Sequence, residues 1–500
     1  MAIYDGTNAP TINVYVDGGN LAANFFVLGV STLSSTTATV TAATGNGTTV
    51  TYTSTNTFTA GQTVTITGLG IASGKSLNLS AVIIATRSST QFTVTNSTTG
   101  TSSGTGTAKQ GDVLHTYVPL QTLIQIPTTD VRNIAIRRGR TREDQTFQPG
   151  TMTLTLDNTS GAYDPEALNS TYSSGTFSMF SGGTNMKITA TWSGVDYALY
   201  AGYIEFIEVS QGLDPVVTIT CVDFFKRLAS TTINLGSFSG YSADAASSFL
   251  SNAGWTYGST VSGTTIVQVA GIPTDTALNA LETLASGQGG RVFCAKDGKA
   301  IFQGYDYIVP SGAALLSFSD QRTSGTIEYD NITVTPGAKY LRNQVVMTNP
   351  YAGATFNGTN WTYYPLSSTF TNTGSSNRFG LVSKAITTYC STAAGPGLVT
   401  IAVFPAIVPG TDTTSGQYLA DHFANADYRV EELDFEVTKL DALGGTIWPS
   451  FLASEVGTKV SVARTPVYTT ARTYTCLIQG MNHDINPDSW RCSLMLSQAT

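Results

Sequence analysis

Apolar and polar residues alternate with a period of two along most of the chain. In residues 151–158, TMTLTLDN, three apolar side chains fall on one face of a strand and three threonines fall on the other. The same alternation recurs in 186–192, MKITATW, and in 216–222, VVTITCV. Since this period is typical of a half-buried strand, the chain is predicted to be mainly β.

Residues 31–110 differ from the rest in composition. Their only charged residues are Lys75, Arg87 and Lys109, and Thr or Ser alternates with Val, Ile, Tyr or Phe between glycine-rich breaks. This pattern predicts an inserted, immunoglobulin-like β-sandwich over 31–110. The alternative is a low-complexity disordered linker, which would not need the sustained apolar period.

A helical period replaces the strand period in three places. Residues 242–253 and 275–287 are expected to be helices, the second with Asp275 as its N-cap, and a further helical segment is expected near 413–428. Lys296 to Lys299, KDGK, is typical of a hairpin turn.

These patterns divide the chain into four parts. The expected domains are a first β module over 1–30 and 111–235, the insertion, an α+β module over 236–340, and a second β module over 341–500. Within the last, 350–400 is rich in Thr, Asn and Gly, and the sequence leaves open whether it is a loop or a small module.

Composition limits the candidate chemistry. A length of 500 residues requires several domains, and a formal net charge of −8 argues against a protein that coats nucleic acid. The histidines are scattered and the cysteines lie in apolar strand patterns, so we expect reduced buried thiols and no metal, cofactor or catalytic site. The cysteines are Cys221, Cys294, Cys390, Cys476 and Cys492, and the histidines are His115, His422 and His483.

The segment 157–166, DNTSGAYDPE, gathers Asp157, Asp164 and Glu166, as a calcium loop does. It lacks the regular ligand spacing of such a loop, so turn chemistry is the favoured interpretation. The start of the chain lacks a basic, apolar leader, and no window approaches 18 apolar residues. We therefore expect synthesis in the cytoplasm and no membrane insertion by the chain itself.

Five arginines fall within eleven residues: Arg132, Arg137, Arg138, Arg140 and Arg142. One interpretation is contact with phosphates, and the other is a strand that runs into a turn at Gly139 and forms ion pairs. Because the whole chain is acidic, we favour the second, with Glu143 and Asp144 as nearby carboxylates.

The order of several motifs resembles one protein family. TDVRNIAIRRGRTREDQTFQPGTMTLTLDNTSGAYDP is followed by MKITATWSGVDYALYAGYIEFIEV, VTITCVDFFKRL, GGRVFCAKDGKAIF and SEVGTKVSVA. This order resembles minor tail proteins that form the tail-tip hub of long-tailed, siphovirus-type bacteriophages. The resemblance is close over 111–345 and moderate over 400–500, and the insertion departs from it.

The resemblance implies a structural role in the virion, at the tail tip, after assembly in the host bacterial cytoplasm. Such hubs are homotrimers in which two tail-tube-like β modules per chain build a ring of pseudo-sixfold symmetry. The implied partners are the distal tail protein, the tape-measure protein and the tail fibre or spike, with transient passage of viral DNA. The arginine turn would then be a charged corner within or between subunits.

The sequence leaves three other functions as alternatives. The insertion could act as an adhesin for a host surface receptor, although Tyr52, Phe58 and Phe92 are spaced as core residues and form no aromatic platform. A tail-associated cell-wall hydrolase lacks a convincing catalytic constellation. DNA binding through the arginine turn is opposed by the acidic balance of the chain.

Overall fold

The computed structural model describes residues 9–17, 37–58, 60, 63–69, 71–72, 75–79, 82–102, 105–110, 123–143, 145–167, 170, 172–174, 177–263, 266–269, 271–304, 312–321, 325–335, 338–356, 361–389, 415–443, 447–467 and 470–499. The chain divides into two compact units, residues 23–119 and residues 1–22 with 120–500. Strands greatly outnumber helices in both, which confirms the mainly β, multidomain class.

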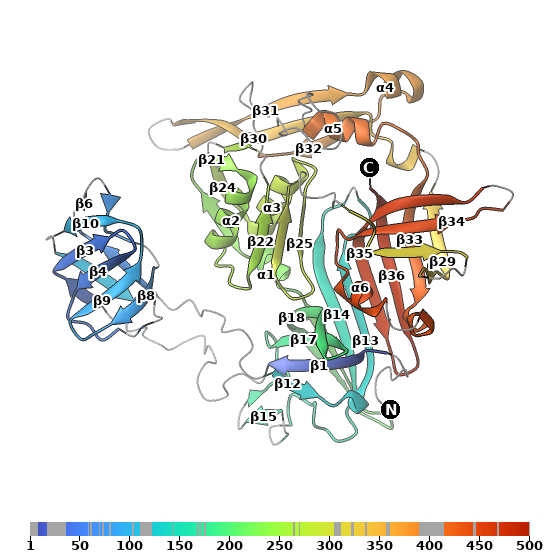
Figure 1. Ribbon diagram of the computed structural model, residues 1–500, viewed down its shortest axis with the longest axis horizontal. Helices are drawn as coiled ribbons and strands as arrows, with labels where there is room; N and C mark the ends of the chain where they lie inside the picture. The colour runs from blue at the N-terminus through green and yellow to red at the C-terminus, as the bar shows by residue number, and fades with distance from the viewer. Residues whose placement is uncertain are drawn as a thin grey trace. The chain divides into compact units, whose positions relative to one another are not determined.

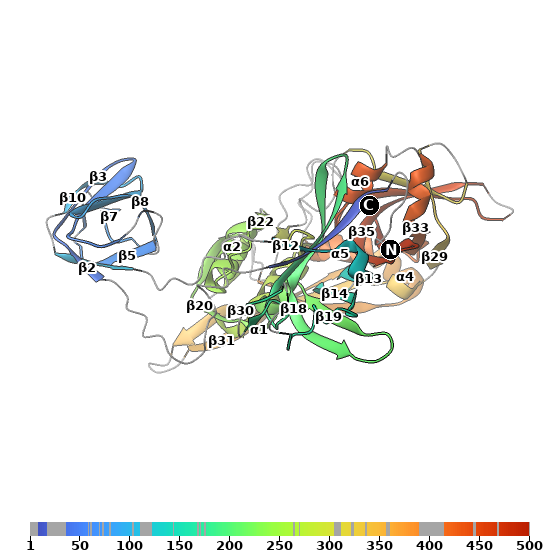
Figure 2. The same ribbon diagram turned by 90° about the horizontal axis from the view of Figure 1, so that it is seen from below.

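The smaller unit is built from the Thr/Ser-rich segment (Figure 2). Eight of its strands pair in the order β10-β3-β4-β9-β8-β5-β11-β2. They enclose one core, and β8 bends at a bulge between Ile84 and Thr86, so that it pairs with both β5 and β9. Its strands are β2 (Thr37–Val40), β3 (Ala42–Asn46), β4 (Thr49–Thr53), β5 (Thr63–Thr67), β6 (Ile71–Ala72), β7 (Lys75–Ser76), β8 (Val82–Arg87), β9 (Gln91–Thr95), β10 (Thr99–Ser102) and β11 (Gly106–Gln110).

Three aromatic residues form the centre of this core. Tyr52 stacks on Phe92, and Phe58 meets Phe92 edge to face, with ring centroids 5.0 and 5.5 Å apart. All three side chains are buried, as the sequence predicted. They are therefore unavailable as an exposed aromatic platform for a glycan.

The first part of the larger unit is an antiparallel sheet in the order β12-β1-β17-β18-β19-β14-β13 (Figure 1). In β14, Met152, Leu154 and Leu156 are fully buried while the threonines between them reach the other face, as the alternation predicted. We call this sheet the first module; its strands are β1 (Thr11–Asp17), β12 (Leu123–Ile126), β13 (Val131–Gly139), β14 (Gln148–Asp157), β17 (Asn185–Trp192), β18 (Val195–Ser210) and β19 (Val216–Val222), with a small hairpin of β15 (Ser173–Ser174) and β16 (Phe177–Ser178).

The second module continues the same sheet. It contains β27 (Leu316–Ser319), β28 (Ile327–Glu328), β29 (Asn331–Thr335), β33 (Arg429–Glu436), β34 (Lys459–Arg464), β35 (Arg472–Ile485), β36 (Trp490–Gln498) and helix α6 (Trp448–Ala453). The expected boundary at residue 340 does not match this pairing. Strands β27 to β29 precede it, yet they pair with β34 and β33, because the buried face of Leu316 and Phe318 belongs to the core of this sheet.

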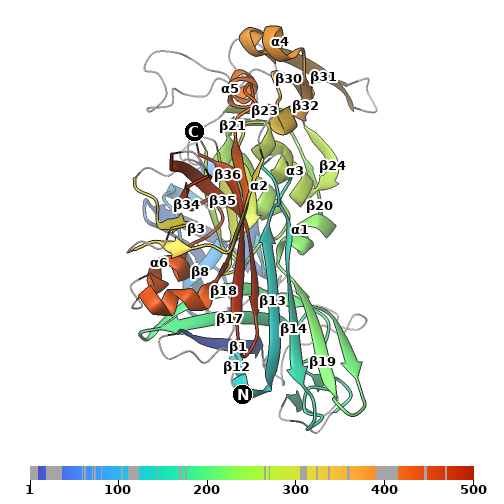
Figure 3. The same cartoon turned by 90° about the vertical axis from the view of Figure 1, so that its right-hand side faces the viewer.

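The two modules are joined where β13 pairs with β35 (Figure 3). Six residue pairs form this seam, from Ile134 opposite Ile485 to Gly139 opposite Gly480. Gly139 has a φ of +91°, and a Cβ there would lie 2.3 Å from the carbonyl oxygen of Gln479. A Cβ on Gly480 would lie 2.7 Å from the carbonyl oxygen of Arg140. Only glycines permit this approach of the two backbones.

A separate helical module follows the first module. It comprises α1 (Phe225–Ser230), β20 (Thr232–Leu235), β21 (Phe238–Tyr241), α2 (Ser242–Asn252), β22 (Ser259–Ser262), β23 (Ile266–Val269), β24 (Ile272–Thr276), α3 (Ala277–Ser286), β25 (Arg291–Cys294) and β26 (Ala300–Gln303). The hairpin β25–β26 turns at Gly298, whose φ is +90°. The expected N-cap Asp275 is wrong by one residue: the Thr276 side chain accepts from Asn279 N, while Asp275 accepts from the Asn279 side chain.

The stretch whose nature the sequence left open contains a three-stranded sheet. Strand β30 (Gln344–Phe356) pairs with β31 (Trp361–Thr371) and with β32 (Ser383–Thr387), and α4 (Thr373–Phe379) connects the last two. The helix expected near 413–428 is α5, Ser415–His422, which packs on β30 and β31. We call β30–β32 with α4 and α5 the cap sheet; residues 390–400 lie outside the described residues.

The glycine pair at the seam yields the first prediction. Gly139→Ala is expected to lower the free energy of unfolding by about 3 kcal/mol or more, because the added methyl group meets backbone atoms as well as an unfavourable φ. Urea midpoints by tryptophan fluorescence measure this loss.

Gly194→Ala is the matched control, since its φ is +78° and nothing lies within 4 Å of an added Cβ. It is expected to cost only about 1 kcal/mol, the cost of the left-handed backbone alone. Equal losses in the two variants would contradict a tight seam.

Candidate functional site

The five arginines do not form one patch. Arg132 pairs with Asp157 and Asp214, each at 2.7 Å, on the surface of the first module. Arg137 is exposed, whereas Arg138, the next residue, is buried because neighbours in a strand point to opposite faces. Arg140 and Arg142 follow the seam in the turn after β13. The alternation of the strand therefore separates these cations into distinct roles.

Arg138 connects three parts of the larger unit. Its NH2 group donates to Glu455 Oε1 of the second module at 2.7 Å and to the carbonyl oxygen of Cys294, in the helical module, at 2.9 Å. Glu455 also accepts from the backbone N–H of Lys296 at 2.9 Å through its other oxygen. Since Arg138 itself belongs to the first module, this group of side chains ties all three modules together.

Lys296 adds further contacts to this group of side chains, which we call the junction. Its Nζ donates to the carbonyl oxygens of Ser454, at 2.9 Å, and of Leu452, at the end of α6. Burial lowers the pKa of Lys296 to about 8, and the charge of Glu455 acts in the opposite direction. A cation near the last carbonyls of a helix offsets the negative end of the helix dipole.

Asp223 holds the first helix of the helical module against the sheet. Its carboxylate accepts from the backbone N–H groups of Gly150, at 2.6 Å, and Phe225, at 3.0 Å. Burial raises the pKa of Asp223 to about 7, although both hydrogen bonds and the Arg138 charge act to lower it. This explains the Val-Asp motif before the helix: the aspartate fixes the start of α1 to β14.

Arg140 and Arg291 each contact the second module, Arg140 at Gln479 and Arg291 at Gly457. Arg140 Nε donates to Gln479 Oε1 at 2.8 Å, and its guanidinium group lies 4.5 Å from the centroid of the Phe147 ring. Arg291 Nε donates to Gln303 Oε1 at 2.6 Å. Gly457 has a φ of +87°, and a Cβ there would overlap the Arg291 guanidinium group. The glycine of the SEVGTKV motif thus leaves space for the arginine of the GGRVF motif.

Glu143 joins the turn to the cap sheet and the second module. It meets His422 Nε2 at 3.2 Å and Arg429 NH1 at 3.3 Å, and its side chain is only one-fifth exposed. Burial acts to raise the pKa of Glu143, but the hydrogen bond with His422 and the charges of Arg429 and Arg140 outweigh it and lower this pKa. Arg142 lies over the Tyr340 ring, 5.8 Å from its centroid. Asp144 lies outside the described residues.

The partners of these side chains come from distant parts of the sequence. Among the residues expected at the site, Glu143 lies beside His422 and Arg429. Arg138 forms its ion pair with Glu455. The site residues expected from the sequence do not include Glu455, Lys296, Arg291, Gly457 or Arg429. A signal existed for most of them, because four of the five lie in the motifs GGRVFCAKDGK and SEVGTKV.

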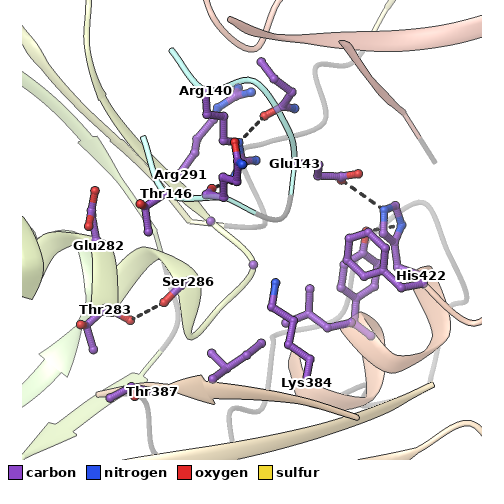
Figure 4. A pocket seen from close by; sticks show the side chains of 18 of the residues that line it. Arg140, Glu143, Thr146, Glu282, Thr283, Ser286, Arg291, Lys384, Thr387 and His422 are labelled. Atoms are coloured by element: carbon purple, nitrogen blue, oxygen red, sulfur yellow. Dashed lines mark hydrogen bonds and ion pairs between the residues drawn. The ribbon is translucent and has the colours of Figure 1, made fainter. Parts of the chain in front are cut away.

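A cavity of about 380 Å³ lies beside this junction (Figure 4). The turn after β13, helix α3, strand β32 and helix α5 surround it. Lys384 points from β32 into the space between α3 and the turn that carries Glu143. The ionisable residues that line the cavity are Arg140, Glu143, Glu282, Arg291, Lys384 and His422.

The remaining candidates have structural partners. Trp490 Nε1 donates to His483 Nδ1 at 3.2 Å, and His422 contacts Glu143, while His115 lies outside the described residues. In the segment 157–166, Asp157 accepts from Thr159 N and Asp164 from Glu166 N, which is turn chemistry. Among the described residues no group of three or more His, Cys, Asp or Glu could hold a metal.

The described cysteines, Cys221, Cys294, Cys476 and Cys492, are buried free thiols, and Cys390 lies outside the described residues. In the described part of the chain, none of the helices has both the length and the apolar character needed to cross a membrane.

Comparisons by sequence find no match, either to a protein-family model or to a curated protein. Solved structures of similar fold include the tail protein from Neisseria meningitidis MC58, at 11% identity and a TM-score of 0.44, covering 75% of this chain and 94% of that one. The 43 kDa tail protein of prophage MuSo2 from Shewanella oneidensis matches at 12% and 0.43, covering 75% and 96%.

The prophage tail protein gp18 from Listeria monocytogenes EGD-e matches at 9% identity and a TM-score of 0.40, covering 76% of this chain and 93% of that chain. The E. coli c3393 protein, a component of the type VI secretion system, also matches, at 7% identity and a TM-score of 0.35, covering 74% of each chain.

The junction predicts a large effect of Arg138→Met. The substitution keeps an unbranched apolar stem but leaves Glu455 without its guanidinium partner in a mostly buried place, which is expected to cost about 3 kcal/mol of stability. Arg132→Met is the control, because it removes an exposed ion pair and is expected to change the urea midpoint little. Similar midpoints for both variants would contradict a stabilising junction.

His483 predicts a dependence of stability on pH. Burial, with the charges of Arg138 and Lys296, lowers the pKa of His483 to about 3, below its unfolded value of about 6.5. The unfolded chain therefore binds a proton that the folded chain excludes, and stability is lost as pH falls from about 6.5 to 3.

His483→Gln removes this proton, so its stability is expected to fall less steeply with acid, by up to about 1.4 kcal/mol per pH unit. Urea midpoints of both proteins between these pH values measure the difference. Parallel curves would show that His483 does not carry the effect.

Proposed function

We propose that this chain is a structural subunit of a bacteriophage tail tip, a hub that assembles as a ring around the path of the tape-measure protein and DNA. The ring links the distal tail protein to the fibre or spike below and opens for DNA release. The order of motifs from the arginine turn to SEVGTKVSVA supports this role. The single observation that carries it is the sheet that runs unbroken through both modules.

One face of this sheet is mainly polar across the seam, and its side chains there are exposed or partly exposed. Thr153 and Thr155 of β14 lie opposite Ala135 and Asn133 of β13, and Ala135 in turn lies opposite Asp484 of β35. The same face continues into β36 and β33. Asp484 of β35 lies opposite Arg491 of β36, which lies opposite Glu436 of β33. Asn482 of β35 lies opposite Ser493 of β36, which lies opposite Asp434 of β33.

The opposite face of these strands is the buried core. Ile134, Leu154, Ile485 and Leu494 alternate with the polar residues and are fully buried. A sheet with one face in the core and a hydroxyl-rich, hydrated face on the other side is suited to form the wall of an aqueous conduit.

The charge of the polar face suits the passage of DNA. On β13, β35, β36 and β33 the polar face carries four carboxylates and two guanidinium groups. The carboxylates belong to Asp484, Glu432, Asp434 and Glu436, and the guanidinium groups belong to Arg137 and Arg491. Arg491 is itself paired with Glu436 at 3.2 Å. Since affinity for nucleic acid requires a basic face, an acidic excess would limit adhesion of DNA to the wall.

This role needs no bond chemistry. Each chain supplies two modules of a continuous wall, so three chains would supply six, in agreement with the homotrimer that the motif order implies. The arginine turn then acts inside each subunit, where Arg138 and Glu143 hold the two modules and the cap sheet in one arrangement.

Native mass spectrometry tests the assembly. The purified chain is expected to form a complex of three times the chain mass of 52.6 kDa. Arg137→Glu changes the polar face alone and is expected to leave this mass unchanged, because the proposal places that side chain in the lumen. A stable monomer at high protein concentration, or dissociation caused by Arg137→Glu, would contradict the proposal.

A further inference from the structure

The hairpin of β34 and β35 holds two arginines against each other. Arg464 lies directly opposite Arg472, beyond the end of β36, whose pairing with β35 begins at Cys476. Like charges that face each other across two strands destabilise the pair. Within the described residues neither arginine forms an ion pair. The carboxylate of Asp320 accepts from the backbone N–H of Thr465 instead, at 2.6 Å. An anionic partner would therefore relieve a repulsion that the chain itself leaves in place.

Aromatic and apolar groups lie beside these two cations. Arg472 lies over the Tyr428 ring, 5.6 Å from its centroid, and this tyrosine is 50% exposed. Val467, in the turn between the two strands, is 76% exposed. Because arginine and tyrosine are enriched at protein interfaces, this surface suits a protein partner better than a nucleic acid. We call Arg464, Val467, Arg472 and Tyr428 the arginine surface. The hairpin that carries it extends past the neighbouring strands of the second module (Figure 1).

A second exposed surface lies in the first module, at the end of β18. Strand β17 pairs with β18 only as far as Tyr203, and in the described part of the chain residues 205–210 have one neighbouring strand, β19. A sheet edge that exposes apolar side chains is prone to pair with another chain and is normally covered. We call this surface the acidic edge; its exposed residues include Glu205, Phe206, Glu208, Val209 and Leu213.

The carboxylates of the acidic edge are available to a partner. Glu208 forms no ion pair with any residue that the structure describes. Glu205 lies 3.5 Å from the Lys226 ammonium group, and both side chains are exposed. Since an exposed pair of this kind contributes little, Glu205 can exchange its partner at low cost. The acidic edge thus matches the arginine surface in charge and in its exposed apolar groups.

We propose that the arginine surface of one chain binds the acidic edge of the next chain. Its two guanidinium groups bind the carboxylates of Glu205 and Glu208, and the exposed apolar groups of the two surfaces pack together. The surfaces belong to different modules, and strands β19, β14 and β13 separate β18 from β35. A contact between two different surfaces runs head to tail and closes into a ring where the rotation permits. This inference rests on the proposed ring and names a contact that holds it together.

Arg472→Glu separates this role from a structural one. It places a carboxylate opposite Arg464, so the urea midpoint of the chain is expected to stay the same or to rise. It also cancels the positive charge of the arginine surface, so the protein concentration at which half of the trimer dissociates is expected to rise at least about tenfold. Sedimentation velocity over a dilution series measures this concentration. Arg378→Glu is the control, because this exposed arginine of α4 lies outside both surfaces, and it is expected to leave the dissociation unchanged.

Reversal of the charges on both sides tests the pairing directly. Glu205→Arg with Glu208→Arg is expected to weaken the trimer by a similar factor. The chain that carries these two changes together with Arg464→Glu and Arg472→Glu is expected to regain most of the lost affinity, because the two surfaces attract each other again.

The outcomes separate this contact from the ring itself. A trimer that Arg472→Glu leaves unchanged, or a fourfold reversal that restores nothing, would overturn the contact and leave the ring in place. A wild-type chain that stays monomeric would overturn both. Binding of duplex DNA that Arg472→Glu abolishes, with the trimer intact, would assign the two arginines to nucleic acid and so contradict the proposal.

Discussion

The pairing of β13 with β35 is the constraint on which the rest of the larger unit depends. Gly139 and Gly480 bring the two backbones together at one end of this seam, where a Cβ on either residue would meet main-chain atoms. The register that they define turns Arg138 toward the buried face, where Glu455 and the carbonyl group of Cys294 receive it. A one-residue slip would turn that guanidinium group to the opposite face of the sheet.

The sequence predicted local features well because they depend on neighbours in the chain. The alternation in β14, the helices α2 and α3, the hairpin at Gly298 and the buried aromatic residues of the Thr/Ser-rich unit follow from periodicity and turn chemistry. The expected boundary at 340 does not reflect the pairing between strands that lie far apart in the sequence. Strands β27 to β29 follow the helical module in sequence, and only their pairing with β34 and β33 assigns them to the second module.

In the candidate site, too, contacts between distant parts of the chain cannot be read from the sequence. The arginine turn is visible as a cluster in the sequence, which predicts ion pairs of these arginines with Glu143 and Asp144, whereas the structure pairs Glu143 with His422 and Arg429 from distant parts of the chain. No local pattern reveals that Arg138 is buried while Arg137 is exposed, or that the carboxylate for Arg138 lies at Glu455, more than three hundred residues away. The motifs around Arg291, Lys296 and Gly457 were recognised as ordered along the chain, but their mutual contacts required the fold.

The central claim is that the polar face of the joined sheet lines a conduit. An electron cryomicroscopy map of the assembled particle, at a resolution that separates strands, tests it most directly. The account predicts that Thr153, Asn482 and Asp434 face the central axis, with the buried core of Leu154 and Ile485 behind them. A map in which this face is turned away from the axis, or is covered by another protein, would contradict it.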